Sequence, residues 1–121
     1  MIFTPAPLTG AWLVELQRHE DQRGFFARTW CRREFETQGL DAALVQCSMS
    51  RNTRRGTLRG MHWQVAPFQE VKLVRCSRGA IWDAVIDLRP DSSRYLRHWG
   101  VELTGENGRA LYIPRGFAHG F

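Results

Sequence analysis

Two side chains that could do chemistry lie in the segment GTLRGMHWQ, Gly56 to Gln64. Histidine gains and loses its proton near neutral pH, so His62 could act as a general base. Arg59 carries a planar guanidinium group, which binds phosphate oxygens through paired hydrogen bonds. The segment otherwise has the apolar content of a strand, so a histidine that simply packs in the core is the alternative interpretation.

Lys72 is the only lysine among the 17 lysines and arginines. Its ammonium is a compact donor that a guanidinium does not reproduce, which favours a specific role, with chance composition as the alternative. The formal net charge of +5 suits either nucleic acid or a small phosphorylated substrate bound by several arginines. The basic cluster RNTRRG, Arg51 to Gly56, has no interleaved aromatic residues for base stacking. We therefore interpret it as a solvated loop and expect no nucleic-acid partner.

The length of 121 residues suits one domain, expected to span 1–121, and the hydrophobic fraction of 43% argues against disorder. The three cysteines Cys31, Cys47 and Cys76 form no CxxC pair, so we expect buried free thiols rather than disulfides or a zinc site. The sequence shows neither an apolar run of membrane-spanning length nor a basic signal-peptide start. A soluble cytoplasmic protein without a membrane partner is expected.

Turn signals recur at short intervals and separate short runs rich in Val, Ile, Leu, Trp and Phe. This spacing favours an antiparallel sandwich or barrel of short strands. Only Arg32 to Thr37 has the pattern of a helix. The candidate strands are Trp12 to Leu16, Phe25 to Trp30, Leu44 to Met49, Thr57 to Gln64, Val71 to Cys76, Ala80 to Leu88, Gly100 to Leu103 and Ala110 to Ile113.

Alternation along three of these strands places ionisable and apolar residues on one face, as in a pocket inside a small barrel. Edge strands with solvated charges are the alternative. Strict alternation would separate Arg59 from His62, unless Gly60 marks a β-bulge. The shared faces are Lys72 with Val74 and Cys76, His62 with Leu58, Gly60 and Gln64, and Asp83 with Ile81, Val85 and Asp87.

Several segments together resemble one family, in order and spacing, from Asp21 to the last residue. They are DQRGFF, VQCSMS, TLRGMHWQ, PFQEVKLVRCSRGAIWDAVIDLR and IPRGFAHGF. They are similar to the dTDP-4-dehydrorhamnose 3,5-epimerases of the cupin superfamily. The resemblance implies an all-β cupin jelly roll, a homodimer, and inversion of C3 and C5 of a dTDP-4-keto-6-deoxyhexose without metal or other cofactor.

The resemblance also implies roles for individual residues. His62 would remove the proton next to the ketone, and Lys72 would stabilise the negative charge that develops on the ketone oxygen. Asp83 is expected to support Lys72 or His62. The implied substrate-binding residues are Arg23, Gln46, Ser48, Arg59 and His119. Arg23 as a plain turn residue, Lys72 as a solvated edge lysine and His119 as a packing residue remain the alternatives.

The sequence departs from the family pattern at several positions. Arg28 and Glu70 stand where a glutamate and a glutamine are usual, and Ser48 replaces an asparagine, which leaves the nucleotide preference open. The family's proton-donating tyrosine follows the position of Phe121. We therefore expect a fragment or truncated gene product whose jelly roll is incomplete at the C-terminus, with a catalytically impaired sugar-nucleotide binder as the alternative.

A metal-dependent cupin is the other alternative. His62, Glu70 and His119 could supply two imidazoles and a carboxylate, a set that suits iron or manganese. Gln64 stands where such a site would have a further histidine, and Glu70 lies late in the motif. The sequence therefore predicts no metal site.

Overall fold

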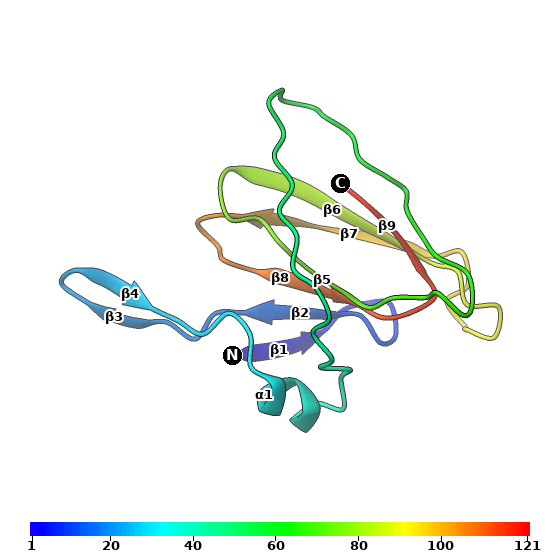
Figure 1. Ribbon diagram of the computed structural model, residues 1–121, viewed down its shortest axis with the longest axis horizontal. Coiled ribbons are helices and arrows are strands. Elements are labelled where there is room, and N and C mark those ends of the chain that lie inside the picture. The colour runs from blue at the N-terminus through cyan, green and yellow to red at the C-terminus, as the bar shows by residue number, and fades with distance from the viewer.

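The computed structural model describes residues 1–121, and its regular secondary structure is mostly short antiparallel strands (Figure 1). One short helix, α1 (Arg32–Thr37), follows the first four strands. The strands are β1 (Ile2–Pro5), β2 (Trp12–Glu15), β3 (His19–Asp21), β4 (Gly24–Phe26), β5 (Lys72–Arg75), β6 (Ala80–Asp87), β7 (His98–Thr104), β8 (Ala110–Ile113) and β9 (Phe117–Gly120).

The first sheet has the strand order β1-β2-β8-β5. Its outer face is covered by α1, which buries Phe35 in a cluster with Val14 and Tyr112. Phe3 meets the Phe35 ring edge to face, with ring centroids 5.1 Å apart. Because a helix of six residues is unstable alone, this packing rather than capping holds α1 in place.

The second sheet has the order β7-β6-β9 and faces the inner side of the first. The main core fills the space between the sheets, with Leu111 and Ile113 from β8 meeting Val85, Leu103 and Phe117 of the second sheet. All five side chains are at most 5% exposed. The two sheets therefore form a sandwich whose inner faces are available to position a site.

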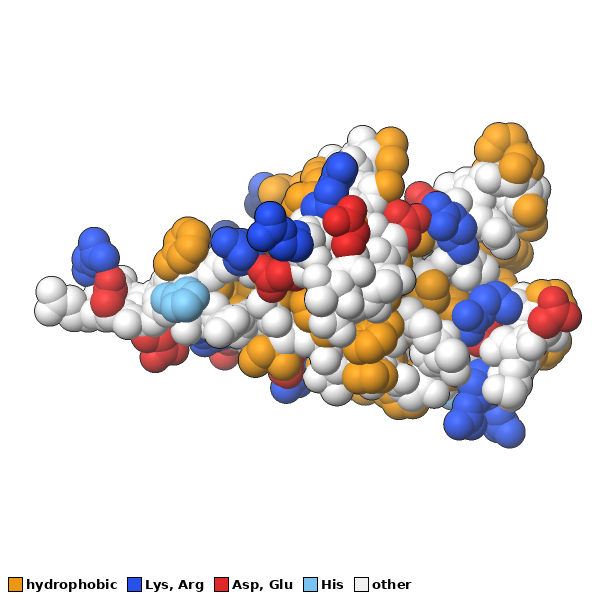
Figure 2. All heavy atoms as spheres, turned by 90° about the horizontal axis from the view of Figure 1, so that it is seen from below, with side chains coloured by type: hydrophobic (Ala, Val, Ile, Leu, Met, Phe, Trp, Pro, Cys, Tyr) orange, Lys and Arg blue, Asp and Glu red, His pale blue; other side chains and the backbone are white.

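The β3–β4 hairpin projects away from this sandwich (Figures 1 and 2). Its strands pair only with each other. Phe25 and Phe26 on β4 are 51% and 75% exposed. The hairpin thus carries apolar surface that the rest of the chain does not cover.

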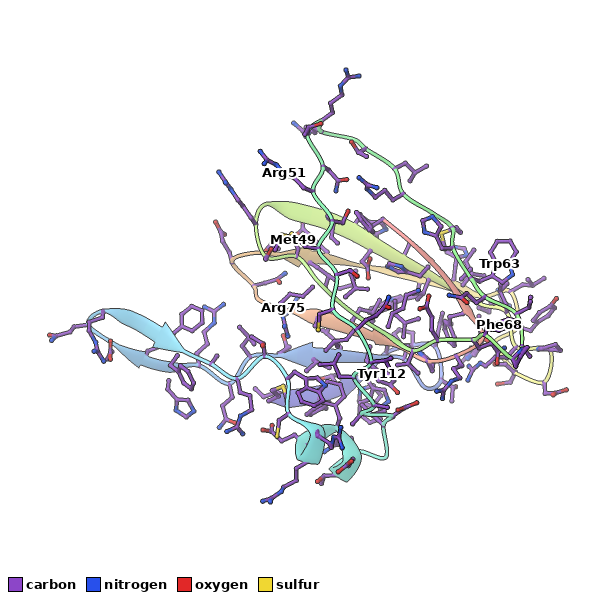
Figure 3. All side chains as sticks on the ribbon, viewed as in Figure 1. Met49, Arg51, Trp63, Phe68, Arg75 and Tyr112 are labelled. Atoms are coloured by element: carbon purple, nitrogen blue, oxygen red, sulfur yellow. The ribbon has the colours of Figure 1, made fainter.

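A long segment from 43 to 70 is exposed at every residue and contains no strand. Met49, Arg51, Trp63 and Phe68 lie along it in Figure 3. The predicted strands Leu44 to Met49 and Thr57 to Gln64 are therefore wrong. Both have strand-like composition, but a strand also requires a neighbouring backbone to complete its hydrogen bonds, and this segment meets one only near His62.

The other expectations have mixed outcomes. The helix has the predicted bounds, and six of the eight predicted strands overlap strands of the structure, whereas β1, β3 and β9 were missed. The thiols are free as expected, but only Cys76 is buried. No helix combines the length and the apolar character needed to span a membrane.

Candidate active site

The backbone around His62 contains a β-bulge at Gly60, the exception to strict alternation that the sequence left open. Arg59 and Phe121 exchange two backbone hydrogen bonds of 2.8 Å, and His62 and His119 exchange two of 2.7 and 2.9 Å. Arg59 and His62 are three positions apart, whereas their partners Phe121 and His119 are two positions apart, which is the pattern of a β-bulge. Since His119 and Phe121 share a face, the extra residue puts Arg59 and His62 on that same face.

Two glycines allow this close approach. Gly60 has φ +124°, and a Cβ there would lie 2.5 Å from the Cα of Gly120. A Cβ on Gly120 would in turn lie 2.9 Å from the carbonyl oxygen of Arg59. Contacts this short do not occur for real Cβ atoms, so both positions require glycine for the segment to pair with β9.

His119 is buried and oriented by Asp83. The imidazole Nε2 donates to Asp83 Oδ1 over 2.7 Å, and both side chains lie on the inner face of the second sheet. Asp83 is fully buried, and its second oxygen, Oδ2, has no hydrogen-bond partner. The expectation that Asp83 supports Lys72 or His62 is corrected, because its partner is His119.

Lys72 lies on the inner face of the opposite sheet. It pairs with Ile113, and Val74 pairs with Leu111, so the lysine points to the side on which the core lies, as alternation predicted. Its ammonium forms an ion pair with Glu70 at the rim of this face. The hydrogen bond from Lys72 is the main cause that lowers the pKa of Glu70.

His62 lies on the side of the second sheet, opposite the sheet that carries Lys72. Its backbone is fixed to His119, but the residue is exposed and its imidazole makes no hydrogen bond within the chain. His62, His119 and Asp83 thus belong to the second sheet and its added segment, whereas Lys72 belongs to the first. A base and a cation on facing inner surfaces are suited to removing a proton next to a polarised carbonyl.

The predicted substrate-binding residues lie mostly on exposed backbone. Arg59 donates from Nε to Asn52 Oδ1 over 2.7 Å and from a terminal nitrogen to the Arg51 carbonyl oxygen over 3.3 Å. Gln46 and Ser48 are exposed on the segment that precedes it. Sequence reasoning missed Asn52, which has no signal apart from lying in the basic cluster.

Arg23 is not brought to this group. It lies at the turn of the β3–β4 hairpin, where its side chain is 85% exposed and pairs with Asp21 over 2.5 Å. Figure 2 shows a basic and an acidic side chain at the tip of the hairpin, away from the body of the protein. Within one chain, Arg23 therefore stands apart from His62 and Lys72.

A partly buried ion pair between Asp87 and Arg89 stabilises the turn that leads into β9. Arg89 donates to both oxygens of Asp87 over 2.8 and 2.6 Å and to the Thr9 carbonyl oxygen over 2.7 Å. Burial alone would raise the pKa of Asp87, but the hydrogen bonds from Arg89 and Ser92 outweigh it and lower the pKa to about 2. This network ties the ends of β6 and β9 to the loop after β1.

No three His, Cys, Asp or Glu side chains lie close enough together to hold a metal ion. Glu70, the carboxylate considered for such a site, is paired with Lys72 instead. Two cavities lie elsewhere, a small one beneath α1 and an open one of about 600 Å³ beside Arg89. Neither is lined by His62, Lys72 or His119.

The chain is similar to the proteins of one known family. Residues 5–121 match the sequence model of the family described as dTDP-4-dehydrorhamnose 3,5-epimerase. The chain belongs to this family. The epimerase of Sinorhizobium fredii is 39% identical over 121 residues, which are all of this chain and 62% of the relative. The chain thus spans less than two thirds of that relative's length.

Solved epimerase structures share the fold. The epimerase of Elizabethkingia anophelis superimposes with a TM-score of 0.93 at 38% identity, covering 99% of this chain and 66% of the other. The Bacillus anthracis epimerase, solved with TDP and PPi bound, gives 0.93 at 37% identity, covering 99% of this chain and 69% of the other. These similarities confirm the predicted all-β, cupin-type jelly-roll fold.

Proposed function

We propose that this chain carries the base and the oxyanion-binding cation of a sugar-nucleotide epimerase. The substrate would be a dTDP-4-keto-6-deoxyhexose in the dTDP-rhamnose pathway, inverted at C3, C5 or both. The observation that carries the proposal is the placement of His62 beside the His119–Asp83 pair, on the sheet that faces Lys72. An enzyme acting on a nucleotide sugar is also consistent with a cytoplasmic location.

In this mechanism His62 removes the proton on the carbon next to the ketone. The electron pair of the broken C–H bond moves toward the carbonyl, and negative charge develops on the ketone oxygen. The Lys72 ammonium stabilises that charge. A fixed cation contributes most at this step, in which negative charge develops. Return of a proton to the opposite face of the carbon completes an inversion, and return to the same face regenerates the substrate.

Other residues would hold the substrate. The guanidinium of Arg59 is kept in position by Asn52 and would bind the diphosphate through paired hydrogen bonds. His119 is kept in one orientation by Asp83, which leaves its other ring nitrogen, Nδ1, for a substrate hydroxyl. Gln46 and Ser48 would contact the nucleotide from the exposed segment.

We propose that Arg23 acts in the site of a second copy within a homodimer. The hairpin that bears it extends away from its own His62, and Phe25 and Phe26 beside it are exposed. Sedimentation at increasing concentration tests this, with Phe26→Ser expected to weaken association. A chain that stays monomeric at all concentrations while still using Arg23 for binding would contradict it.

Deuterium exchange tests the catalytic proposal. Proton NMR of dTDP-4-keto-6-deoxyglucose in deuterated buffer should show loss of the C3 or C5 proton with the wild type and none with His62→Ala. His98→Ala is the matched control, because His98 is exposed at the start of β7 and lies on its outer face. Exchange that survives His62→Ala would refute the role of His62. Tight dTDP binding without any exchange would favour a sugar-nucleotide-binding protein.

A further inference from the structure

The Lys72–Glu70 ion pair is a feature that the proposed mechanism does not use. The two side chains come from positions two apart, at the start of β5, and are 26% and 41% exposed. The hydrogen bond to Glu70 is the only one that the ammonium makes within the chain. In the free protein the ammonium therefore already donates one of its three N–H groups to a carboxylate, which holds it near Glu70.

Glu70 is ionised at neutral pH, which suits it to this contact. Its pKa is lowered, mainly by the hydrogen bond from Lys72. The carboxylate is thus ionised throughout the neutral range. An ionised carboxylate is a stronger acceptor for an ammonium group than a neutral ketone oxygen is.

We propose that Glu70 is a positioning residue that holds the Lys72 ammonium at the rim of the site and competes with the substrate's ketone oxygen for it. The inference rests on the proposed function, in which Lys72 stabilises the oxyanion. A neutral ketone competes poorly with the carboxylate, whereas an oxygen that has gained negative charge competes on similar terms. Glu70 thereby weakens the contact of Lys72 with bound substrate, and Lys72 has to leave the carboxylate to reach the charged oxygen of the transition state, so KM is higher with Glu70 than without it.

The first test measures the reactivity of Lys72 without substrate. Because Lys72 is the only lysine, an acylating reagent at limiting dose labels just two amines, Lys72 and the Met1 terminus. Acylated Lys72 resists trypsin, so the label is read on the peptide from Gly60 to Arg75. Glu70→Gln is expected to raise the labelling rate of Lys72 about two- to five-fold, the range of an exposed ion pair.

The Met1 ammonium provides a matched control within the same molecule. It is paired with Glu34 over 2.6 Å, so Glu70→Gln should leave its labelling rate unchanged. Glu34→Gln should do the reverse, raising the rate at Met1 and sparing Lys72. Equal Lys72 rates in the wild type and Glu70→Gln, with both proteins folded by circular dichroism, overturn the inference.

The second test separates KM from kcat in the deuterium-exchange reaction. Glu70→Gln removes the competing carboxylate and should lower the KM of the 4-keto substrate about three-fold, with a smaller change in kcat. The Kd of dTDP should stay unchanged. A KM that is unchanged or raised overturns the competition. If the wild type shows no exchange, the proposed function fails, while the labelling result still decides whether Glu70 holds Lys72.

Discussion

Gly60→Ala should separate the segment that carries His62 from β9. The added Cβ would lie 2.5 Å from the Cα of Gly120 and 2.9 Å from the carbonyl oxygen of His119. Both are backbone atoms, so the contact is relieved only if the segment moves away. The φ of +124° adds roughly 1–3 kcal/mol for a residue with a side chain.

The size of the effect follows from the hydrogen bonds at risk. Four backbone hydrogen bonds join Arg59 to Phe121 and His62 to His119. At about 1 kcal/mol each, their loss lowers the free energy of local opening by up to about 4 kcal/mol. The core between the sheets is not touched, so the fold should be retained while a displacement of His62 by about 1 Å costs roughly 100-fold in exchange rate.

Amide hydrogen exchange and the deuterium-exchange assay together check this prediction. In Gly60→Ala, the amides of Arg59 and His62 should lose protection while those of β6 keep it. Gly56→Ala is the matched control, since Gly56 has φ +75° but no atom within 4 Å of an added Cβ. Gly56→Ala should therefore keep the deuterium-exchange rate of the wild type. Native protection and an exchange rate within three-fold of wild type in Gly60→Ala would refute the reasoning.

Two further predictions concern Arg59 and Asp87. Arg59→Lys should raise the Kd of dTDP about ten-fold in calorimetry, because one ammonium replaces a guanidinium that Asn52 orients. Arg94→Lys, on the exposed connection between β6 and β7, should leave the Kd unchanged. The pKa of Asp87 falls from 3.8 to about 2 on folding. Its ionised carboxylate therefore adds about 2 kcal/mol to the free energy of unfolding above pH 4, and this contribution is lost as the pH falls toward 2. Asp87→Asn should therefore lower stability to urea at pH 7 and flatten its dependence on pH below 4, and an unchanged slope would contradict this.

The sequence predicted well those elements whose own pattern decides their structure. β6 alternates so regularly that the burial of Asp83, Val85 and Asp87 follows from spacing alone. The place of Lys72 on the inner face follows from β5 in the same way. Both strands are paired along their whole length, β6 with β7 and β9 and β5 with β8, so local periodicity and tertiary structure agree.

The sequence predicted poorly those segments whose structure depends on a distant partner. Leu44 to Met49 has the composition of a strand but no neighbouring backbone, whereas β9 is a strand although it contains Gly120, because β6 lies beside it. The partner predicted for Asp83, Lys72 or His62, was likewise wrong, because Asp83 pairs with His119. Asp83 and His119 are 36 positions apart in the sequence, so the register of β6 and β9 that brings them together does not follow from local spacing.

The position of His62 shows how these two kinds of information combine. Alternation would have placed Arg59 and His62 on opposite faces, and the glycine between them allowed a bulge without requiring one. The bulge forms because Gly120 on β9 offers a backbone with no side chain, so that two glycines far apart in sequence can meet. The position of His62 therefore depends on four hydrogen bonds at the edge of one sheet, whereas Lys72 belongs to a strand of the other sheet. Substitutions near Gly60 should thus impair proton removal well before they impair folding.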